Sequence, residues 1–357
     1  MGFPGLRSQD LQLSSLRVES LPFVETNIPD TSVKTMNHPA FLSIVTATTG
    51  KFTSAWLDRL LSVQGSVEFV FVYPPGLTPP SIDDPRVKIV ISSFKGEVMQ
   101  RLAGLFNATG TYTIALDDDD FIHPDICKIA QQFFEQFPES WVLRLSMSRI
   151  FYKDLDLIDA EWVDVPPIAT MPCLYERPPE PSAATFHYLR PLPIAPLKNR
   201  FNWLLMINPF INRRDQHGPH IENFNNKIWN TSLVQKALPE FSKSMKLWGN
   251  LTWIPFWSLD RTLGLFIQAI YFNPKIATIG YRLEGPEQVR YILNGTSPEK
   301  KNSRLSRRFY FSADLLLAKH FPSYGYFWNL FFDGLYTTIK QHIKLAWQDI
   351  FHRHSPD

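Results

Sequence analysis

The stretch GTYTIALDDDDFIHPD, residues 110–125, decides the fold class. Its first part, TYTIALD (111–117), is short and rich in β-branched and aromatic residues, as buried strands are. Four consecutive carboxylates, Asp117 to Asp120, follow at the carboxyl end of this strand, and Pro124 then opens a predicted helix, DICKIAQQFFEQF (125–137). Open α/β sheets bind ligands at the carboxyl ends of their strands, so the aspartates mark a candidate site.

Four adjacent carboxylates repel one another, and a divalent cation would relieve that repulsion. Oxygen ligands in a short, open cluster suit Mg²⁺ or Mn²⁺, which take one or two protein carboxylates and complete their shell with water and phosphate oxygens. The sequence therefore predicts Mn²⁺ or Mg²⁺ as cofactor and a phosphate ester as substrate. The alternative is that acids such as Asp120 cap the following helix, which would account for one or two of the four.

The segments before this stretch predict a parallel sheet. The chain reads FLSIVTATTG (41–50), a helical stretch FTSAWLDRLLSVQG (52–65), VEFVFVYPPG (67–76) and VKIVISS (87–93), with a mixed stretch to residue 107. Short apolar strands separated by helices are typical of a sheet that helices bury on both faces. The predicted fold class is therefore α/β, doubly wound, with a mostly parallel sheet.

Composition and missing motifs exclude several classes of function. The chain has 357 residues, 44% hydrophobic and 20% charged, and its net charge of 36 − 34 = +2 gives no field that would attract nucleic acid. Neither a Walker loop nor a GxGxxG follows the first strand, which ends in TATTG, so P-loop hydrolysis and Rossmann hydride transfer are not expected. The aspartyl-phosphatase pattern DxDx[T/V] is broken by Phe121.

The stretch RLAGLFNATGTYTIALDDDDFIHP (101–124) resembles the core signature of family 2 glycosyltransferases of the GT-A fold. That signature runs Arg-Asn, Gly, Ala, Gly, a short strand, Leu-Asp-x-Asp-Asp and Pro. The residues that stand at matching spacings are Arg101, Gly104, Ala108, Gly110, Leu116, Asp117, Asp119, Asp120 and Pro124. The resemblance covers residues 40–137 and implies a GT-A-like fold with a helical, loop-rich C-terminal elaboration. It also implies transfer of a sugar from a nucleotide diphosphate sugar to an acceptor hydroxyl, with inversion.

The resemblance also implies roles at the donor. Asp117 and Asp119 would hold the metal on the diphosphate, with Asp119 the direct ligand and Asp117 nearer the ribose. The remaining donor-binding residues would be Thr46, Ala47 and Thr48 at the end of the first strand, with Asp118 and with Arg101 near the phosphates. For Arg101 the alternative is a solvated helix face.

Two departures from the family pattern concern the nucleotide. Leu102 replaces the usual Asn. The second strand ends in VYPPG where many members have an Asp that contacts the base, so Tyr73 is expected to stack on the base instead. The identity of the nucleotide stays open.

An inverting transfer needs a base that removes the proton of the acceptor hydroxyl. In the family this base is the Asp of a Glu-Asp pair at the start of a helix, and WIPFWSLDRTLGLFIQAI (253–270) resembles that element. Asp260 is therefore the predicted base, although Leu259 replaces the Glu. The alternative is a capping Asp in a salt bridge with Arg261.

Aromatic and histidine side chains after the proline-rich segment are weaker candidates for the acceptor site. Trp253 and Trp257 are predicted to line it, with a core role as the alternative. His187, His217 and His220 are interpreted as exposed loop residues, with an acceptor contact or an extra metal ligand as the alternative.

The predicted organisation has four parts. They are an arm (1–38), a nucleotide-sugar-binding half (39–138), an acceptor-side half (139–320) and a C-terminal amphipathic helix (321–357). The segment 165–197 carries nine prolines, too many for a helix and badly placed for a central strand, so an ordered loop is expected.

The C-terminal helix is expected to pack on the catalytic domain or on a second subunit, or to lie at a membrane interface near a lipid-linked acceptor. Lys340 and Lys344 stand opposite its aromatic stripe. The sequence shows no signal peptide, no run of 18 apolar residues and only two cysteines, which are interpreted as reduced thiols. A cytoplasmic protein, with peripheral membrane contact as an option, is expected.

The expected partners are the donor and a saccharide, lipid-linked or protein acceptor, and nucleic acid is not expected. Two other functions stay open. One is a nucleotidyltransferase that makes sugar nucleotides, for which the TATTG loop is poor in glycine. The other is a non-catalytic nucleotide-sugar-binding protein of the same fold, which the departures at Leu102 and Leu259 favour.

Overall fold

The computed structural model describes residues 40–176, 187–211, 213, 220–246, 256–293 and 310–353. The chain divides into two units: the first, residues 1–37, lies outside the described residues, and the second, residues 38–357, holds every element below. The predicted arm (1–38) is thus not described.

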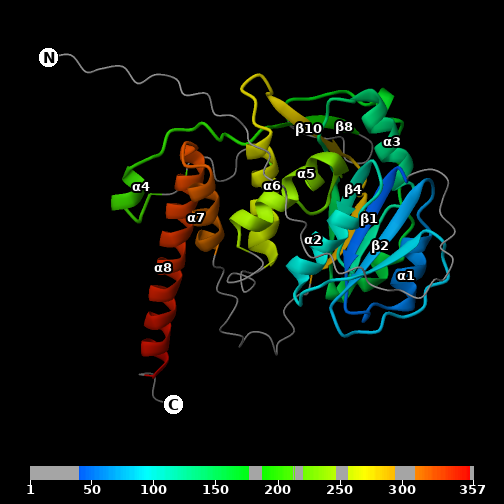
Figure 1. Ribbon diagram of the computed structural model, residues 1–357, viewed down its shortest axis with the longest axis horizontal. Helices are drawn as coiled ribbons and strands as arrows, with labels where there is room; N and C mark the ends of the chain where they lie inside the picture. The colour runs from blue at the N-terminus through cyan, green and yellow to red at the C-terminus, as the bar shows by residue number, and fades with distance from the viewer. Residues whose placement is uncertain are drawn as a thin grey trace, which may run out of the picture. The chain divides into compact units, whose positions relative to one another are not determined.

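An eight-stranded sheet runs through this unit in the order β3-β2-β1-β4-β9-β6-β10-β8 (Figure 1). The strands are β1 (Leu42–Ala47), β2 (Val67–Tyr73), β3 (Val87–Ile91), β4 (Tyr112–Ala115), β6 (Val142–Arg144), β8 (Tyr188–Pro193), β9 (Lys227–Asn230) and β10 (Thr278–Glu284). Strands β3, β2, β1 and β4 pair in parallel, as do β6 and β10, whereas β9 and β8 run antiparallel to their neighbours. The predicted α/β class with a mostly parallel sheet is confirmed.

A second sheet has the order β5-β11-β7, with β5 (Asp120–Ile122), β7 (Met147–Phe151) and β11 (Val289–Leu293). Two 3₁₀ helices, Tyr152–Ile158 and Ile168–Thr170, lie in the loops after β7. Since β5 begins at Asp120, that carboxylate belongs to a strand. Helix α3 (Ile126–Gln136) has Asp125 at its N-cap position, so Asp120 is not the cap that the alternative interpretation required.

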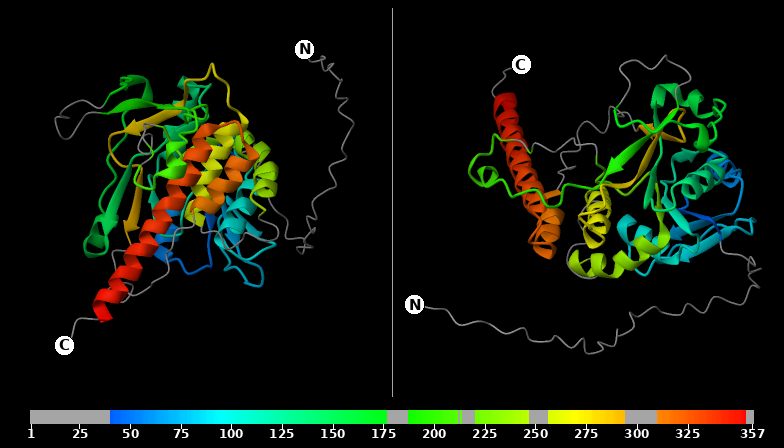
Figure 2. Two further views of the ribbon diagram at one scale, coloured as in Figure 1. Left: turned by 90° about the vertical axis from the view of Figure 1, so that its left-hand side faces the viewer. Right: turned by 90° about the horizontal axis from the view of Figure 1, so that it is seen from above.

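Helices cover both faces of the main sheet (Figures 1 and 2). One face packs on α1 (Ser54–Leu61) and α3, through side chains such as Phe69, Phe71 and Ile114. The other face packs on α2 (Glu97–Asn107), α5 (Thr231–Ser244) and α6 (Phe256–Ile270), and the same core continues into α7 (Tyr310–His320) and α8 (Gly325–Arg353). This double covering explains why the strands read as continuous apolar runs.

The structure differs from the sequence expectations at two places. The mixed stretch before residue 107 is helix α2, which presents Met99, Leu102 and Leu105 to the sheet. The proline-rich segment holds a strand, β8, among its described residues. It lies at the edge of the sheet, the position where Pro191 and Pro193 are tolerated because fewer N–H groups are needed for pairing.

The strands of 39–138 and of 139–320 occupy opposite halves of the sheet. Their division into a donor half and an acceptor half stays a prediction.

Gly104 lets α2 approach the sheet closely. A Cβ at this position would overlap Val45 and lie 2.8 Å from Val72 Cγ2. We expect Gly104→Ala to lower the free energy of unfolding by about 1–3 kcal/mol in urea titrations, although alanine favours helix more than glycine does. Gly334→Ala in α8 is the control, because its added Cβ would meet only ordinary contacts of 3.4 Å or more. Equal effects of the two substitutions would contradict the close packing.

Candidate functional site

The four aspartates form a tight turn at the carboxyl edge of the sheet, directly after β4. The backbone N–H of Asp120 donates to the carbonyl oxygen of Asp117 at 3.1 Å, which closes the turn. Asp117 leans toward α2 and forms an ion pair with Arg101, while 41% of its side chain stays exposed. The aspartate turn at the end of β4 is thus held in part by a side chain of α2.

Asp118 faces the end of β1. The hydroxyl of Thr48 donates to Asp118 Oδ2 at 2.6 Å, and the same hydroxyl accepts from the backbone N–H of Gly50 at 2.9 Å. Thr46 is buried in the sheet and Ala47 is half-buried. Of the predicted β1 residues, Thr48 is therefore the one whose side chain contacts the aspartate turn.

Tyr73 corrects one expectation. Its side chain is 0% exposed and belongs to the core beneath α1 and α3, so neither face of its ring is open to a nucleotide base. Burial, together with the charge of Asp118, raises the pKa of Tyr73 to about 12. Tyr73 is therefore a core residue, and its ring does not stack on a base in this structure.

The pKa values of Asp119 and Asp120 in the turn are raised above those of fully solvated aspartates. Partial desolvation of its carboxyl group and the charge of Asp118 raise the pKa of Asp119, although the residue as a whole is exposed. Burial and the charge of Asp119 raise the pKa of Asp120 to about 7. Both carboxyls therefore keep their protons to a higher pH than a fully solvated aspartate does.

The residues of the turn fit a hard divalent cation. Asp119 is exposed and Asp117 keeps part of its carboxylate open, and oxygen donors of this kind suit Mg²⁺ or Mn²⁺. Among the described residues, no group of three or more His, Cys, Asp and Glu side chains is arranged to hold a metal on its own. The remaining ligands of a cation here would come from substrate phosphate and water.

Arg101 lies deeper than expected. Its side chain is 4% exposed, and it pairs with Asp117 and, at 3.1 Å, with Glu97 Oε1. Arg101 therefore does not lie on a solvated helix face, and its guanidinium group is engaged by carboxylates. Arg101 instead holds Asp117 in place at the edge of the sheet.

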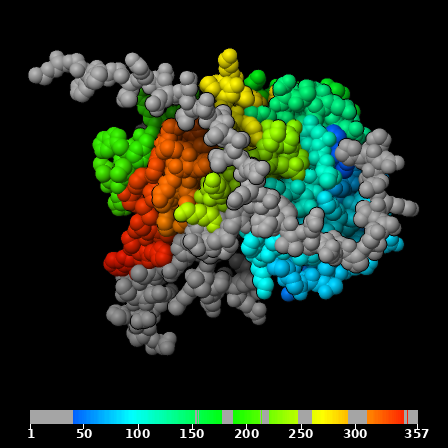
Figure 3. Space-filling view, in the orientation of Figure 1, coloured from blue at the N-terminus to red at the C-terminus, as the bar shows by residue number. Residues whose placement is uncertain are grey.

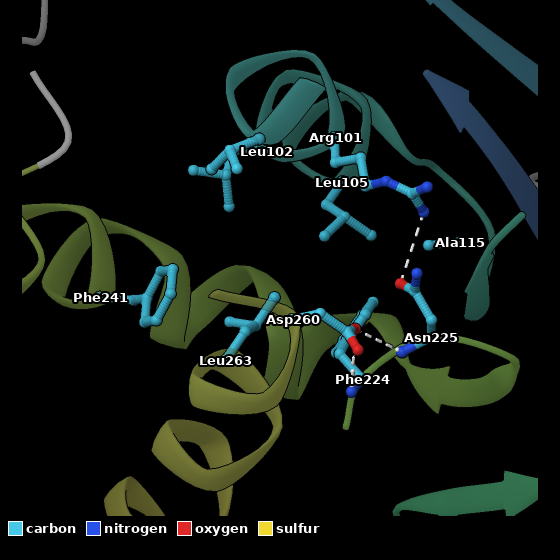
Figure 4. Close-up of a pocket in the computed structure, with 10 residues that line it drawn as sticks. Arg101, Leu102, Leu105, Ala115, Phe224, Asn225, Phe241, Asp260 and Leu263 are labelled. Atoms are coloured by element: carbon cyan, nitrogen blue, oxygen red, sulfur yellow. Dashed lines mark hydrogen bonds between the residues drawn. The ribbon is translucent and has the colours of Figure 1, made fainter. Parts of the chain in front are cut away.

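Asp260 lies near the beginning of α6 and is 7% exposed. Its Oδ1 accepts from two backbone N–H groups, those of Phe224 at 3.1 Å and Asn225 at 2.7 Å (Figure 4). Burial raises the pKa of Asp260, while the nearby charge of Lys227 and these two donors lower it. The described residues make no hydrogen bond to its Oδ2, which leaves that oxygen for another proton donor.

Arg101 and Asn225 link the aspartate turn to Asp260. Besides Asp117, Arg101 donates to the side-chain oxygen of Asn225 through a long hydrogen bond of 3.4 Å, and the backbone of Asn225 holds Asp260. Arg101, Asn225 and Asp260 border a small pocket between α2, α5 and α6 (Figure 4). The remaining lining residues are apolar: Val98, Leu102, Leu105, Ala115, Phe224, Phe241 and Leu263. A chain of contacts through Arg101 and Asn225 thus links two carboxylates that lie far apart in the sequence.

The salt bridge considered for Asp260 forms elsewhere. Arg261 pairs with Asp314 of α7 at 2.5 Å and lies 3.8 Å from Glu222. Glu222 also accepts from Arg213 at 3.1 Å and from the hydroxyl of Tyr326. This buried network ties α6, α7 and α8 together, which leaves Asp260 to the pocket.

The weaker acceptor candidates are only partly described. Trp253, His217 and the side chain of Trp257 lie outside the described residues. His220 is buried and its Nε2 lies 2.9 Å from the hydroxyl of Tyr326, so it belongs to the network around Glu222 and is not an exposed loop residue. His187 precedes β8, and burial lowers its pKa.

Asn225 and Lys227 are site residues that sequence reasoning missed. Both follow from the turn FNNK before β9, in which Asn226 has φ = 56°. The backbone N–H groups that donate to Asp260 belong to Phe224 and Asn225, the two residues before this left-handed position. Adjacent asparagines before a strand are the signal that could have revealed this turn.

No protein-family model matches the chain, and no curated protein matches it. Among solved structures, residues 1–349 of TarS from S. aureus in complex with UDP align with 16% identity and a TM-score of 0.40, covering 78% of this chain and 64% of that chain. The complex of the same protein with UDP-GlcNAc aligns with 13% identity and a TM-score of 0.41, over 78% and 65%. This chain thus spans less than two thirds of these two neighbours. A 2-C-methyl-D-erythritol 4-phosphate cytidylyltransferase from Thermus thermophilus aligns with 10% identity and a TM-score of 0.28, over 73% and 90%.

Proposed function

We propose that this chain is a glycosyltransferase that moves a sugar from a nucleotide diphosphate sugar to an acceptor hydroxyl, with inversion and with the help of Mn²⁺ or Mg²⁺. The observation that carries the proposal is the link from Asp117 through Arg101 and Asn225 to Asp260. It connects the aspartate turn to the candidate base, and Arg101, Asn225 and Asp260 line one pocket. The sequence resemblance to the GT-A signature supports the same assignment.

Each side chain has a defined task in this proposal. Asp119 and Asp117 would hold the divalent cation, whose charge stabilises the diphosphate as it leaves. Arg101 positions Asp117, and Thr48 positions Asp118 beside the donor. Asp260 accepts the proton of the acceptor hydroxyl at Oδ2 while two backbone N–H groups fix its Oδ1. The raised pKa of Asp260 makes its carboxylate a stronger base than an exposed aspartate.

Calorimetric titration with UDP, GDP and TDP sugars, with and without Mn²⁺, tests the proposal. We expect one nucleotide to bind at least about tenfold more tightly with Mn²⁺, and the bound donor to release nucleotide on incubation. Metal-dependent binding without any release, also with candidate acceptors, would favour a non-catalytic binding protein. Formation of a sugar nucleotide from a nucleoside triphosphate and a sugar phosphate would instead identify a nucleotidyltransferase.

We further propose that the α4–α8 surface contacts a membrane. We define this surface by the exposed side chains Trp203, Met206, Ile207, Phe210, Ile339 and Ile343, on and around α4 (Leu204–Ile207) and on α8. Figure 3 shows the two segments next to each other. The hydroxyl of Tyr336 on α8 donates to the carbonyl of Met206, and Lys340 Nζ lies 5.6 Å from the ring centre of Phe210. Exposed aromatic and aliphatic side chains beside lysines are typical of interfacial binding to anionic lipid. No described helix is long and apolar enough to cross a bilayer.

Sedimentation with vesicles of phosphatidylglycerol and phosphatidylcholine tests this contact. We expect the double substitution Trp203→Ser and Phe210→Ser to lower the partition coefficient about tenfold or more, since each ring loses the gain from burial in the interface. Phe151→Ser, at an exposed position on β7, is the control. Unchanged partitioning would contradict the proposal, and a loss of dimer in the double variant would assign the surface to a second copy.

A further inference from the structure

Four cations form a row across neighbouring strands of the main sheet. Lys227 of β9 lies opposite Arg144 of β6, Arg144 opposite Arg282 of β10, and Arg282 opposite Arg190 of β8. Residues that are paired in register project from the same face of a sheet, so the four side chains share one face. We call these four residues the basic row.

The basic row starts beside the proposed base. Trp229, Val142 and Leu192 each lie two residues along a strand from a member of the row, and they point into the core that faces α5 and α6. Side chains two residues apart on a strand project from the same face. The row therefore lies on that face, further toward the sheet edge. Strand β9 pairs with β4, with Thr113 opposite Trp229, which brings Lys227 level with the end of β4. The row therefore begins near Asp260 and extends away from the aspartate turn.

Two carboxylates face the four residues of the row: Asp260 beside Lys227, and Glu284. Glu284 lies 2.9 Å from Arg190 and 3.0 Å from Arg282, and so serves two cations. The side chain of Arg144 forms no hydrogen bond or ion pair with the part of the chain that the structure describes. Burial and the neighbouring charges of Arg282 and Arg190 lower the pKa of Arg144 to about 10, and burial lowers that of Lys227 to about 7.

Like charges placed directly opposite each other destabilise a sheet. A row of four such residues beside two carboxylates, Asp260 and Glu284, thus costs stability, which is expected where the side chains serve a ligand. The side chains of Arg190 and Arg282 are 28% and 27% exposed, so an anion can reach them. Guanidinium groups match phosphate oxygens in bidentate geometry, and three strand spacings give the row a length of about 14 Å.

We propose that the basic row is an anion subsite that binds a phosphate group of the acceptor, next to the hydroxyl that Asp260 deprotonates. This inference rests on the proposed function. The acceptor would be a phosphorylated or phosphodiester-containing molecule, with its hydroxyl at Asp260 and its phosphate on Arg144, Arg282 and Arg190. The diphosphate of the donor is the other source of the same chemistry. It is the less suitable one, because the row extends away from Asp117 and Asp119.

Calorimetric titration of the full chain with inorganic tripolyphosphate, without metal, tests the subsite. We expect Arg144→Gln and Arg190→Gln each to raise the Kd about tenfold or more, and Arg144→Lys to retain most of the binding. Arg149→Gln, an exposed arginine on β7, is the charge-matched control and should change the Kd less than about twofold. Arg190 lies on the edge strand, so its variant remains informative if the Arg144 variant does not fold.

Two further arms separate the sources of the anion. In the presence of Mn²⁺ and the nucleotide diphosphate that binds, tripolyphosphate should still bind, and Asp119→Asn should leave its Kd unchanged. Displacement by the nucleotide would assign the row to the donor and overturn the proposal. Absence of tripolyphosphate binding, or equal binding by all variants, would overturn it as well. Binding of tripolyphosphate together with failure of every nucleotide to bind would contradict the proposed function and, with it, the assignment to an acceptor.

Discussion

Replacing Asp119 by Asn is expected to lower metal-dependent turnover of the donor by about two to four orders of magnitude, because several kcal/mol of charge stabilisation are lost with the cation. Asn keeps the size of the side chain and removes its charge. Asp119 is exposed at the end of the turn, so the substitution should leave the free energy of unfolding nearly unchanged. Turnover is measured as nucleotide release at saturating Mn²⁺.

Asp83→Asn is the matched control for this experiment. Asp83 is also an exposed aspartate and lies in the loop between β2 and β3, outside the turn. It should keep full turnover. Retention of metal-dependent turnover by the Asp119 variant would show that the cation is held elsewhere.

Asp260→Asn is expected to reduce kcat by about two to four orders of magnitude and to leave the affinity for the donor unchanged. The amide cannot accept the proton of the acceptor hydroxyl, but its oxygen can still accept from the N–H groups of Phe224 and Asn225. Donor binding by calorimetry and kcat by product formation are measured on the same preparation. A loss of donor affinity with little change in kcat would make Asp260 a structural residue.

The pH dependence of kcat gives a second test of Asp260. Its carboxyl must be ionised to act as a base, and burial raises its pKa. The acid limb of the profile should therefore lie above the pH at which an exposed aspartate titrates, with kcat rising as pH rises through this value. In Asn225→Ala the contact to Arg101 is lost. The positive charge of Arg101, which stabilises the ionised Asp260, is then less well placed, so the acid limb should move to a still higher pH. A limb at the ordinary aspartate pKa would contradict the buried base.

The parts of the fold that depend on local sequence were predictable. The apolar runs of β1, β2 and β4 and the aspartates after β4 follow from patterns within a few residues. Helix α2 was not predicted, although Gly104 and Arg101 within it were identified from their spacing. The contact of Arg101 with Asn225 could not be predicted, because Asn225 comes from a distant turn.

The acceptor side depends on the pairing of strands that lie far apart in the sequence, so most of it could not be predicted from the sequence. Strand β6 has three residues, too few for a period to appear, and the row from Lys227 to Arg190 arises only once four strands align in register. The prolines indicated the absence of a central strand, which agrees with the edge position of β8. They did not indicate that Arg190 would face the site from that edge.

The most direct test of the central claim is a crystal structure with Mn²⁺ and the nucleotide sugar that calorimetry selects. We predict a manganese ion bound to the carboxylate of Asp119 and to the diphosphate. We also predict that Asp260 Oδ2 faces the anomeric carbon from the side opposite the leaving group. A nucleotide bound away from the aspartate turn, or an Asp260 carboxylate that does not face the anomeric carbon, would contradict the account.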